Sequence, residues 1–204
     1  MTVRTTLLAL PLLLPLAAQA QPAPQDPEWP CNQRLVPELA LGQMWSGPQP
    51  PAGAFWASDA EISPLALTLA NPEVPVDEAA RRARTFAEAQ PAPARSERMA
   101  LLFQGTLEVI NGERSRIIQN IRNYTRNQRA LAEKITAENA GLVDLPVSPL
   151  AAVPEHLVAL KRQRDWDIRI FEDRQKSMKY LCDQPVLLEQ RAFEMGRAMK
   201  AMLP

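Results

Sequence analysis

Few side chains in this sequence have types and spacings that could do chemistry. Its 204 residues include one histidine, His156, and two cysteines, Cys31 and Cys182. Two thiols are too few for a structural zinc site, and a single imidazole excludes every arrangement that needs two. The sequence also lacks a glycine-rich phosphate loop and a nucleophile motif. We therefore predict no catalytic, cofactor-binding or metal-ligating residue.

Two weaker candidates for chemistry remain. Four methionines at helical spacing could hold Cu(I), although such methionines more often fill a core: Met178, Met195, Met199 and Met202. Carboxylates gather between Asp165 and Asp173, but Asp165 and Asp167 cannot face each other on a helix because they are only two residues apart. A helical ligand- or metal-binding protein, and an enzyme without a recognisable motif, stay open as alternatives.

The compartment of the protein decides what its cysteines do. Arg4 precedes an apolar run from Leu7 to Leu16, and Ala18-Gln19-Ala20 follows with the small-x-small pattern of a signal peptidase site. We expect residues 1–20 to be a signal peptide, cleaved near Ala20, and the mature chain to be exported to a periplasm or the extracellular space. No other run approaches the roughly 18 apolar residues of a membrane span, so we expect no transmembrane segment in the mature chain.

Export favours a disulfide. An even pair of cysteines in an oxidising compartment is normally bonded. We predict a bond between Cys31 and Cys182, which would tie the N-terminal segment to the last third of the chain. The alternative is two separate buried thiols.

Proline divides the mature chain into an irregular part and a helical part. Prolines crowd the stretch from Pro22 to Pro75, whereas none lies between Pro93 and Pro146. Because an interior proline breaks a helix, we predict an irregular Pro- and Trp-rich arm over residues 21–57 and then a single helical domain. The domain spans residues 58–204, with helices expected at about 59–70, 76–89, 96–139, 154–182 and 186–203.

The strongest periodic signal is a coiled-coil seam. From Phe103 to Ile135, eight of ten positions at alternating spacings of four and three residues are apolar. The two polar interruptions, Arg114 and Gln128, are expected to fix register rather than to do chemistry. Asn111-Gly112 is a possible break, but the seam keeps its phase there and favours one long helix.

The seam spacing returns after residue 154, so the two long helices should pair antiparallel. We expect Phe171 near Ile121 and Arg164 near Gln128 in that pair. Asp183-Gln184-Pro185 should interrupt the second helix and leave a kinked or separate final helix.

These elements predict an all-α fold. Apolar residues surround the first helical turns after Met99, whereas beyond Glu113 nearly everything off the seam is polar. We expect a long antiparallel helical hairpin, a coiled-coil-like stalk, on a small helical base with the irregular Pro-rich N-terminal arm against it. Gly105 and Gly112 lie on one line of the helix and predict a close-packed neighbour, for which the tryptophan-bearing arm is a candidate.

The loop at the tip of the stalk is unusually apolar. Six leucines and valines lie in twelve residues that join two polar helices, namely Leu142, Val143, Leu145, Val147, Leu150 and Val153. They either fold back to plug the end of the hairpin or form a patch that docks on a protein or a membrane surface.

The stalk is also basic. Residues 113–134 and 161–176 hold twelve basic and six acidic side chains, a net charge of +6, whereas the whole chain is balanced with 23 of each sign. Arg122, Arg126 and Arg129 are therefore candidates for steering an anionic partner. The alternative is a solvated face whose arginines pair with acidic residues across the helices. Nucleic acid is not expected as a partner after export.

Together these features predict an exported, non-catalytic helical protein that acts by protein–protein or membrane-surface interaction, as an adaptor, a scaffold or a chaperone-like protein. The sequence identifies neither the partner nor the oligomeric state.

Overall fold

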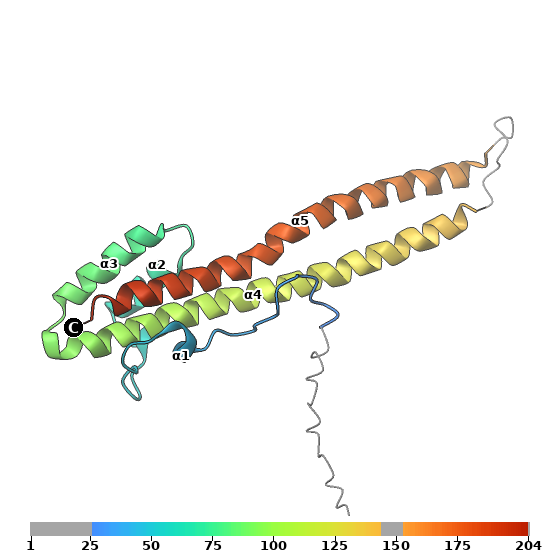
Figure 1. Cartoon of the computed structure of the whole chain (residues 1–204). Helices are drawn as coiled ribbons and strands as arrows, with labels where there is room; N and C mark the ends of the chain where they lie inside the picture. The colour runs from blue at the N-terminus through green and yellow to red at the C-terminus, as the bar shows by residue number, and fades with distance from the viewer. Residues whose placement is uncertain (1–25, 144–152, 204) are drawn as a thin grey trace, which may run out of the picture.

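The computed structural model describes residues 26–143 and 153–203, and Figure 1 shows their arrangement. Short helices come first: α1 (Leu41–Met44), a 3-10 turn (Trp56–Ser58), α2 (Ile62–Ala70) and α3 (Val76–Ala89). Two long helices follow, α4 (Ala92–Gly141) and α5 (Glu155–Lys200), and no strand occurs among the described residues. The predicted all-α hairpin is confirmed, since α4 and α5 run antiparallel with α2 and α3 packed at one end.

The helix starts follow local chemistry. Asp59 lies three residues before α2, and its Oδ1 accepts the N–H groups of Glu61 and Ile62 at 3.0 Å each. Those hydrogen bonds satisfy donors that a helix start leaves unpaired. α4 begins four residues earlier than expected, at Ala92, because Pro93 falls in its first turn, where a missing N–H costs nothing.

The core lies in the base. Its largest fully buried side chains come from α2, α4, the end of α5 and the arm, and include Ile62, Phe103, Met195 and Leu39. Trp45, just after α1, stacks on Phe103 with ring centroids 5.0 Å apart. Beyond Glu113, by contrast, α4 buries only a single stripe, as the polar pattern of this stretch indicates.

Gly105 and Gly112 of α4 differ in their surroundings. A Cβ built on Gly105 would lie 2.7 Å from the ring of Trp56, so the predicted close contact with the tryptophan-bearing arm is confirmed there. A Cβ on Gly112 would have no neighbour within 4 Å, so the same prediction is wrong for that residue. Trp56 is held by its Nε1, which donates to Glu108 at 2.5 Å.

The expected separate final helix is wrong, because α5 is one continuous helix from Glu155 to Lys200, whereas the alternative of a kink near Pro185 stays a prediction. A proline inside a helix displaces main-chain carbonyls from their helical partners. Here Gln33 of the arm donates to the Cys182 oxygen at 2.5 Å, and Arg114 of α4 donates to the Pro185 oxygen at 3.2 Å. The Cys182 and Pro185 carbonyls thus have partners outside α5.

The expected register of the hairpin is also wrong, by one heptad. Gln128 donates to the Phe171 oxygen at 3.1 Å, whereas the pattern placed Phe171 against Ile121. Arg164 accordingly meets Asn139, at 3.3 Å, instead of Gln128. Both polar seam residues bond to the main chain of α5, Gln128 at Phe171 and Arg114 at Pro185, which supports their expected role in fixing register.

Candidate functional site

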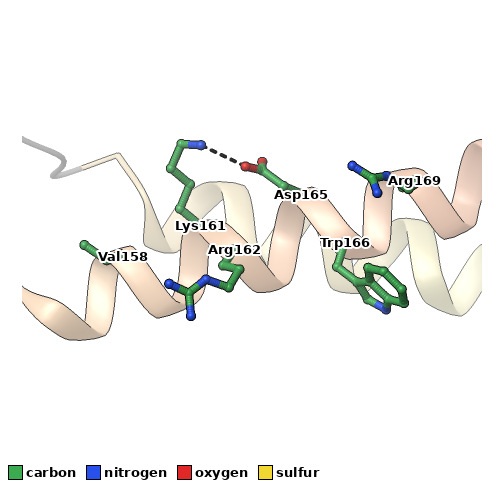
Figure 2. A pocket seen from close by; sticks show the side chains of 6 residues that line it. All are labelled: Val158, Lys161, Arg162, Asp165, Trp166 and Arg169. Carbon is green, nitrogen blue, oxygen red and sulfur yellow. Dashed lines mark hydrogen bonds and ion pairs between the residues drawn. The ribbon is translucent and has the colours of Figure 1, made fainter.

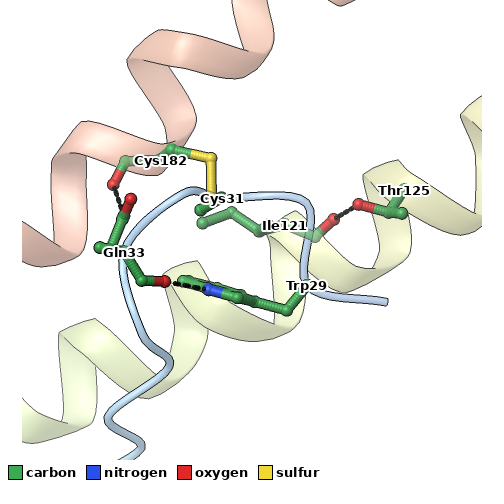
Figure 3. The surroundings of a disulfide bond; sticks show 6 residues. All are labelled: Trp29, Cys31, Gln33, Ile121, Thr125 and Cys182. Atoms are coloured by element: carbon green, nitrogen blue, oxygen red, sulfur yellow. Dashed lines mark hydrogen bonds between the residues drawn. A yellow bond between two sulfur atoms is a disulfide. The ribbon is translucent and has the colours of Figure 1, made fainter. Parts of the chain in front are cut away.

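The disulfide anchors the arm to the hairpin. Cys31 and Cys182 are bonded, with Cα atoms 5.5 Å apart, which confirms the predicted pairing across 151 residues. Figure 3 shows the arm turning across the hairpin here, with Trp29 and Gln33 on either side of Cys31. Trp29 donates through Nε1 to the Gln33 oxygen at 2.8 Å, and Ile121 lies fully buried beside the disulfide. The arm therefore contacts both long helices.

The three candidate arginines of the stalk, here called the arginine row (Arg122, Arg126 and Arg129), already have partners. These partners belong to the acidic segment of the arm, residues 26–28. Arg122 donates to Asp26 at 2.7 Å, and Arg126 donates to Glu28 at 2.6 Å. Arg129 donates to the Pro27 oxygen at 2.9 Å.

The acidic segment has its own local order. The N–H of Glu28 donates to Asp26 Oδ1 at 2.9 Å. This hydrogen bond and the one from Arg122 lower the pKa of the Asp26 carboxyl below its ordinary value, so it is charged at neutral pH. The row and the segment are thus paired opposite charges.

A second charged group lies within the hairpin. The buried carboxylate of Asp167 accepts from Lys134 at 2.6 Å and from Gln163 at 3.0 Å, and the buried Glu138 lies 3.6 Å from the same Lys134 amine. The hydrogen bonds from Lys134 and Gln163 lower the pKa of Asp167. An ionised, cation-paired carboxylate is poorly suited to donate a proton, so this group holds the helices together rather than offering an acid catalyst.

Trp166 forms the most unusual surface of the hairpin. Its side chain is 56% exposed on α5. It helps to line a hollow of about 400 Å³. Figure 2 shows the side chains around this hollow. We call this the Trp166 surface; its residues are Val158, Lys161, Arg162, Asp165, Trp166 and Arg169. Lys161 pairs with Asp165 at 2.8 Å, so their charges cancel. The net positive charge of the surface therefore comes from Arg162 and Arg169.

Sequence reasoning missed the Trp166 surface. The available signal was a tryptophan outside the apolar seam of α5, with an arginine four residues before it and another three residues after it. On a helix these positions are neighbours. Such a tryptophan cannot serve the seam, so it points to an external contact.

The tip loop lies only partly within the described residues. Leu142 is buried, as the folded-back alternative expects, whereas Val143 is 79% exposed and Val153 is 41% exposed. Leu145, Val147 and Leu150 fall in residues 144–152, outside the described part of the chain. Val143 follows the end of α4 and Val153 precedes α5, so both lie at the same end of the hairpin as the first turns of α5, which carry the Trp166 surface.

Two apolar hollows occur elsewhere. One, of about 450 Å³, lies between α4, α5 and the turn after α2, and exposed Leu67 and Leu187 are among its lining residues. The other, of about 300 Å³, lies between α4 and α5 next to the arginine row, and Pro30, Phe171 and Met178 help to line it.

Metal clusters and membrane-spanning helices were also sought among the described residues. Within residues 26–143 and 153–203, no group of three or more histidine, cysteine, aspartate or glutamate side chains is placed to hold a metal ion. None of the helices in these ranges is long and apolar enough to cross a membrane. Comparisons with protein-family models, curated proteins and solved structures found no match, so function is argued from geometry.

Proposed function

We propose that this protein is an exported, non-catalytic helical interaction protein that binds an acidic partner protein through the distal hairpin, residues 113–143 and 153–184. The disulfide supports the export part of the proposal, because such bonds persist in oxidising compartments, and the N-terminal leader pattern agrees with it. The binding part depends mainly on one observation, the exposure of Trp166 between two arginines.

Exposing an indole on a helix forgoes a large gain from burial, since an aromatic side chain can bury about 150–250 Å². Tryptophan and arginine are also the side chains most enriched at the centres of protein interfaces. Arg162 and Arg169 favour carboxylates on the partner, because a guanidinium group forms bidentate hydrogen bonds with a carboxylate. The surface thus has the composition of a binding centre for an acidic protein.

The same surface fits a membrane less well. A helix that lies in a membrane interface needs a broad apolar face. Here Val158 and Trp166 are the only apolar side chains among the six residues of the Trp166 surface. A protein partner is therefore the better match, and binding to anionic lipid is the competing outcome in the test.

The test begins with a photo-crosslinking amino acid at position 166, compared with the same amino acid at Tyr180, which is 72% exposed on α5 outside the Trp166 surface. A partner captured at position 166 alone is then purified for binding measurements. Trp166→Ala should weaken its binding about 30-fold, the effect of losing roughly 2 kcal/mol at an interface centre, whereas Tyr180→Ala should not.

Two results would contradict the proposal. Equal binding by the Trp166→Ala and wild-type chains would remove the Trp166 surface from the interface. Flotation of the wild-type chain with phosphatidylglycerol vesicles, lost on Trp166→Ala, would assign the surface to lipid instead.

We include the tip loop in the same interface. The double variant Leu145→Ser, Leu150→Ser should weaken partner binding without lowering the melting temperature, because exposed leucines lose little on becoming serine. If the loop folds back as a plug, each buried leucine would instead cost about 2–5 kcal/mol and the variant would melt early.

A further inference from the structure

The arginine row receives a turn of chain, which the Trp29 N–H closes by donating to the Asp26 carbonyl oxygen at 2.9 Å. Its members are spaced by four and then three residues on α4, so they form one line on the helix surface. Along this line they contact the Asp26 carboxylate, the Glu28 carboxylate and the Pro27 carbonyl. The pattern recognised is two carboxylates, two residues apart, with an acceptor oxygen between them.

The acidic segment is held on the row by weak contacts. The side chains of Arg126 and Glu28 are 49% and 32% exposed, and those of Arg122 and Asp26 are 26% and 28% exposed. Ion pairs this accessible to water are screened and contribute little to stability.

The rest of the arm is fixed without the acidic segment. The disulfide at Cys31 and the hydrogen bond from Gln33 to Cys182 hold it downstream. Residues 26–28 can therefore leave the row while the fold stays intact.

Space for a larger occupant adjoins the row. The apolar hollow of about 300 Å³ is bordered by Arg129, and its floor includes Phe171 and Met178. The arm reaches this hollow only through Pro30, which is itself one of the lining residues. A segment that carries an apolar side chain next to its carboxylates could make both contacts at once. The apolar side chain would fill the hollow, and the carboxylates would pair with the arginine row.

We infer that the arginine row and the adjoining hollow form a binding site for an acidic, turn-forming segment of a partner protein, and that the chain's own residues 26–28 occupy part of this site. The occupant is tethered, so it competes at high local concentration, and a partner segment must displace it. Charge complementarity identifies the class of partner, and the seated segment shows the binding mode. This site is separate from the Trp166 surface and stands without it.

The test uses the full chain and a labelled peptide with the sequence of residues 25–30, Gln-Asp-Pro-Glu-Trp-Pro. In the double variant Asp26→Asn, Glu28→Gln, the tethered segment keeps its shape but loses its charges. Fluorescence anisotropy should show that this variant binds the peptide at least tenfold more tightly than the wild-type chain does. Adding salt should weaken that binding.

Two further variants locate the site. Adding Arg122→Gln and Arg126→Gln to the double variant should abolish peptide binding. Adding Arg81→Gln and Arg82→Gln instead, which removes two exposed positive charges on α3 outside both surfaces, should leave binding unchanged. Melting temperatures and mapping of the disulfide would establish that each variant is folded, and the single Glu28→Gln change repeats the test with less perturbation.

Equal peptide affinity for the wild-type chain and the folded double variant would overturn the inference, and so would binding that survives loss of Arg122 and Arg126. Neither result bears on Trp166, so the proposed function and this inference can fail separately.

Discussion

Replacing Gly196 with alanine probes the tightest contact in the base. A Cβ on this residue of α5 would lie 2.1 Å from the Met44 carbonyl oxygen and 3.2 Å from the Phe103 ring. Ordinary contact begins at 3.4 Å, so the Met44 main chain would have to move by roughly 1.3 Å. Trp45 follows directly and stacks on Phe103, so the same shift would disturb the core.

The expected loss follows from two opposing effects. Overpacking a core costs about 1–3 kcal/mol, and the upper end applies here because the obstructing atom belongs to the backbone. Alanine stabilises a helix interior by about 1 kcal/mol relative to glycine, which is a poor helix former, and this gain offsets part of the loss. We expect Gly196→Ala to lower the free energy of unfolding by about 2 kcal/mol.

Gly112→Ala is the matched control. It makes the same change inside a long helix, where a Cβ would have no neighbour within 4 Å, so it should stabilise the protein by about 0.5–1 kcal/mol. Gly105→Ala should fall between the two, because the atoms in its way belong to the Trp56 side chain, which can move.

Thermal unfolding, monitored by circular dichroism, gives the melting temperature of all three variants. For a chain of this size, a change of about 1 kcal/mol in the free energy of unfolding shifts the melting temperature by about 2–4 °C. The melting temperature should fall in the order Gly112→Ala, wild type, Gly105→Ala, Gly196→Ala. If Gly196→Ala melts at or above the wild-type temperature, the reasoning about the contact between α1 and α5 is refuted.

Three further predictions concern the arm and the seam. Cys31→Ser should lower the free energy of unfolding by about 2–5 kcal/mol by removing the constraint on the unfolded chain, and a denaturation midpoint equal to that of the wild type would contradict this. Ile121→Asp should cost several kcal/mol in the same assay through a buried unpaired charge, whereas a silent change would mean that the seam is not packed there. The contact between Asp26 and Arg122 should open in acid: the folded-state pKa of Asp26 lies below its unfolded value of about 3.9, so its stabilisation is present above that pH and is lost as the pH falls through the folded-state pKa. The Glu28 amide signal in NMR spectra would report this opening, and an amide shift that is constant from neutral pH to pH ~2 would argue against it.

The helices were predictable because seam periodicity and proline placement act locally. The register was not, because an apolar seam repeats every seven residues and a slip of one heptad keeps it largely apolar. Gln128 breaks this degeneracy through a hydrogen bond to the Phe171 main chain, and main-chain acceptors have no sequence signature. The contacts around Pro185 were hidden for a similar reason, since their donors, Gln33 and Arg114, lie far away in the sequence.

The candidate site shows the same limit. The basic charge of the stalk was visible in the sequence, but its pairing with the arm was not. Arg122 pairs with Asp26, 96 positions away, and Arg126 pairs with Glu28, 98 positions away. Nothing local favoured that pairing over partners across the helices. Trp166 differs, because its place outside the seam was visible in the sequence.

The span of the disulfide sets an order of events during biosynthesis. Cys182 leaves the ribosome 151 residues after Cys31, a delay of about 8–30 s at 5–20 residues per second. Throughout this interval Cys31 has no partner cysteine in the chain, and the arm lacks the part of its docking surface that α5 supplies. Oxidation joins an early segment to a late one, so it is a closing step of maturation.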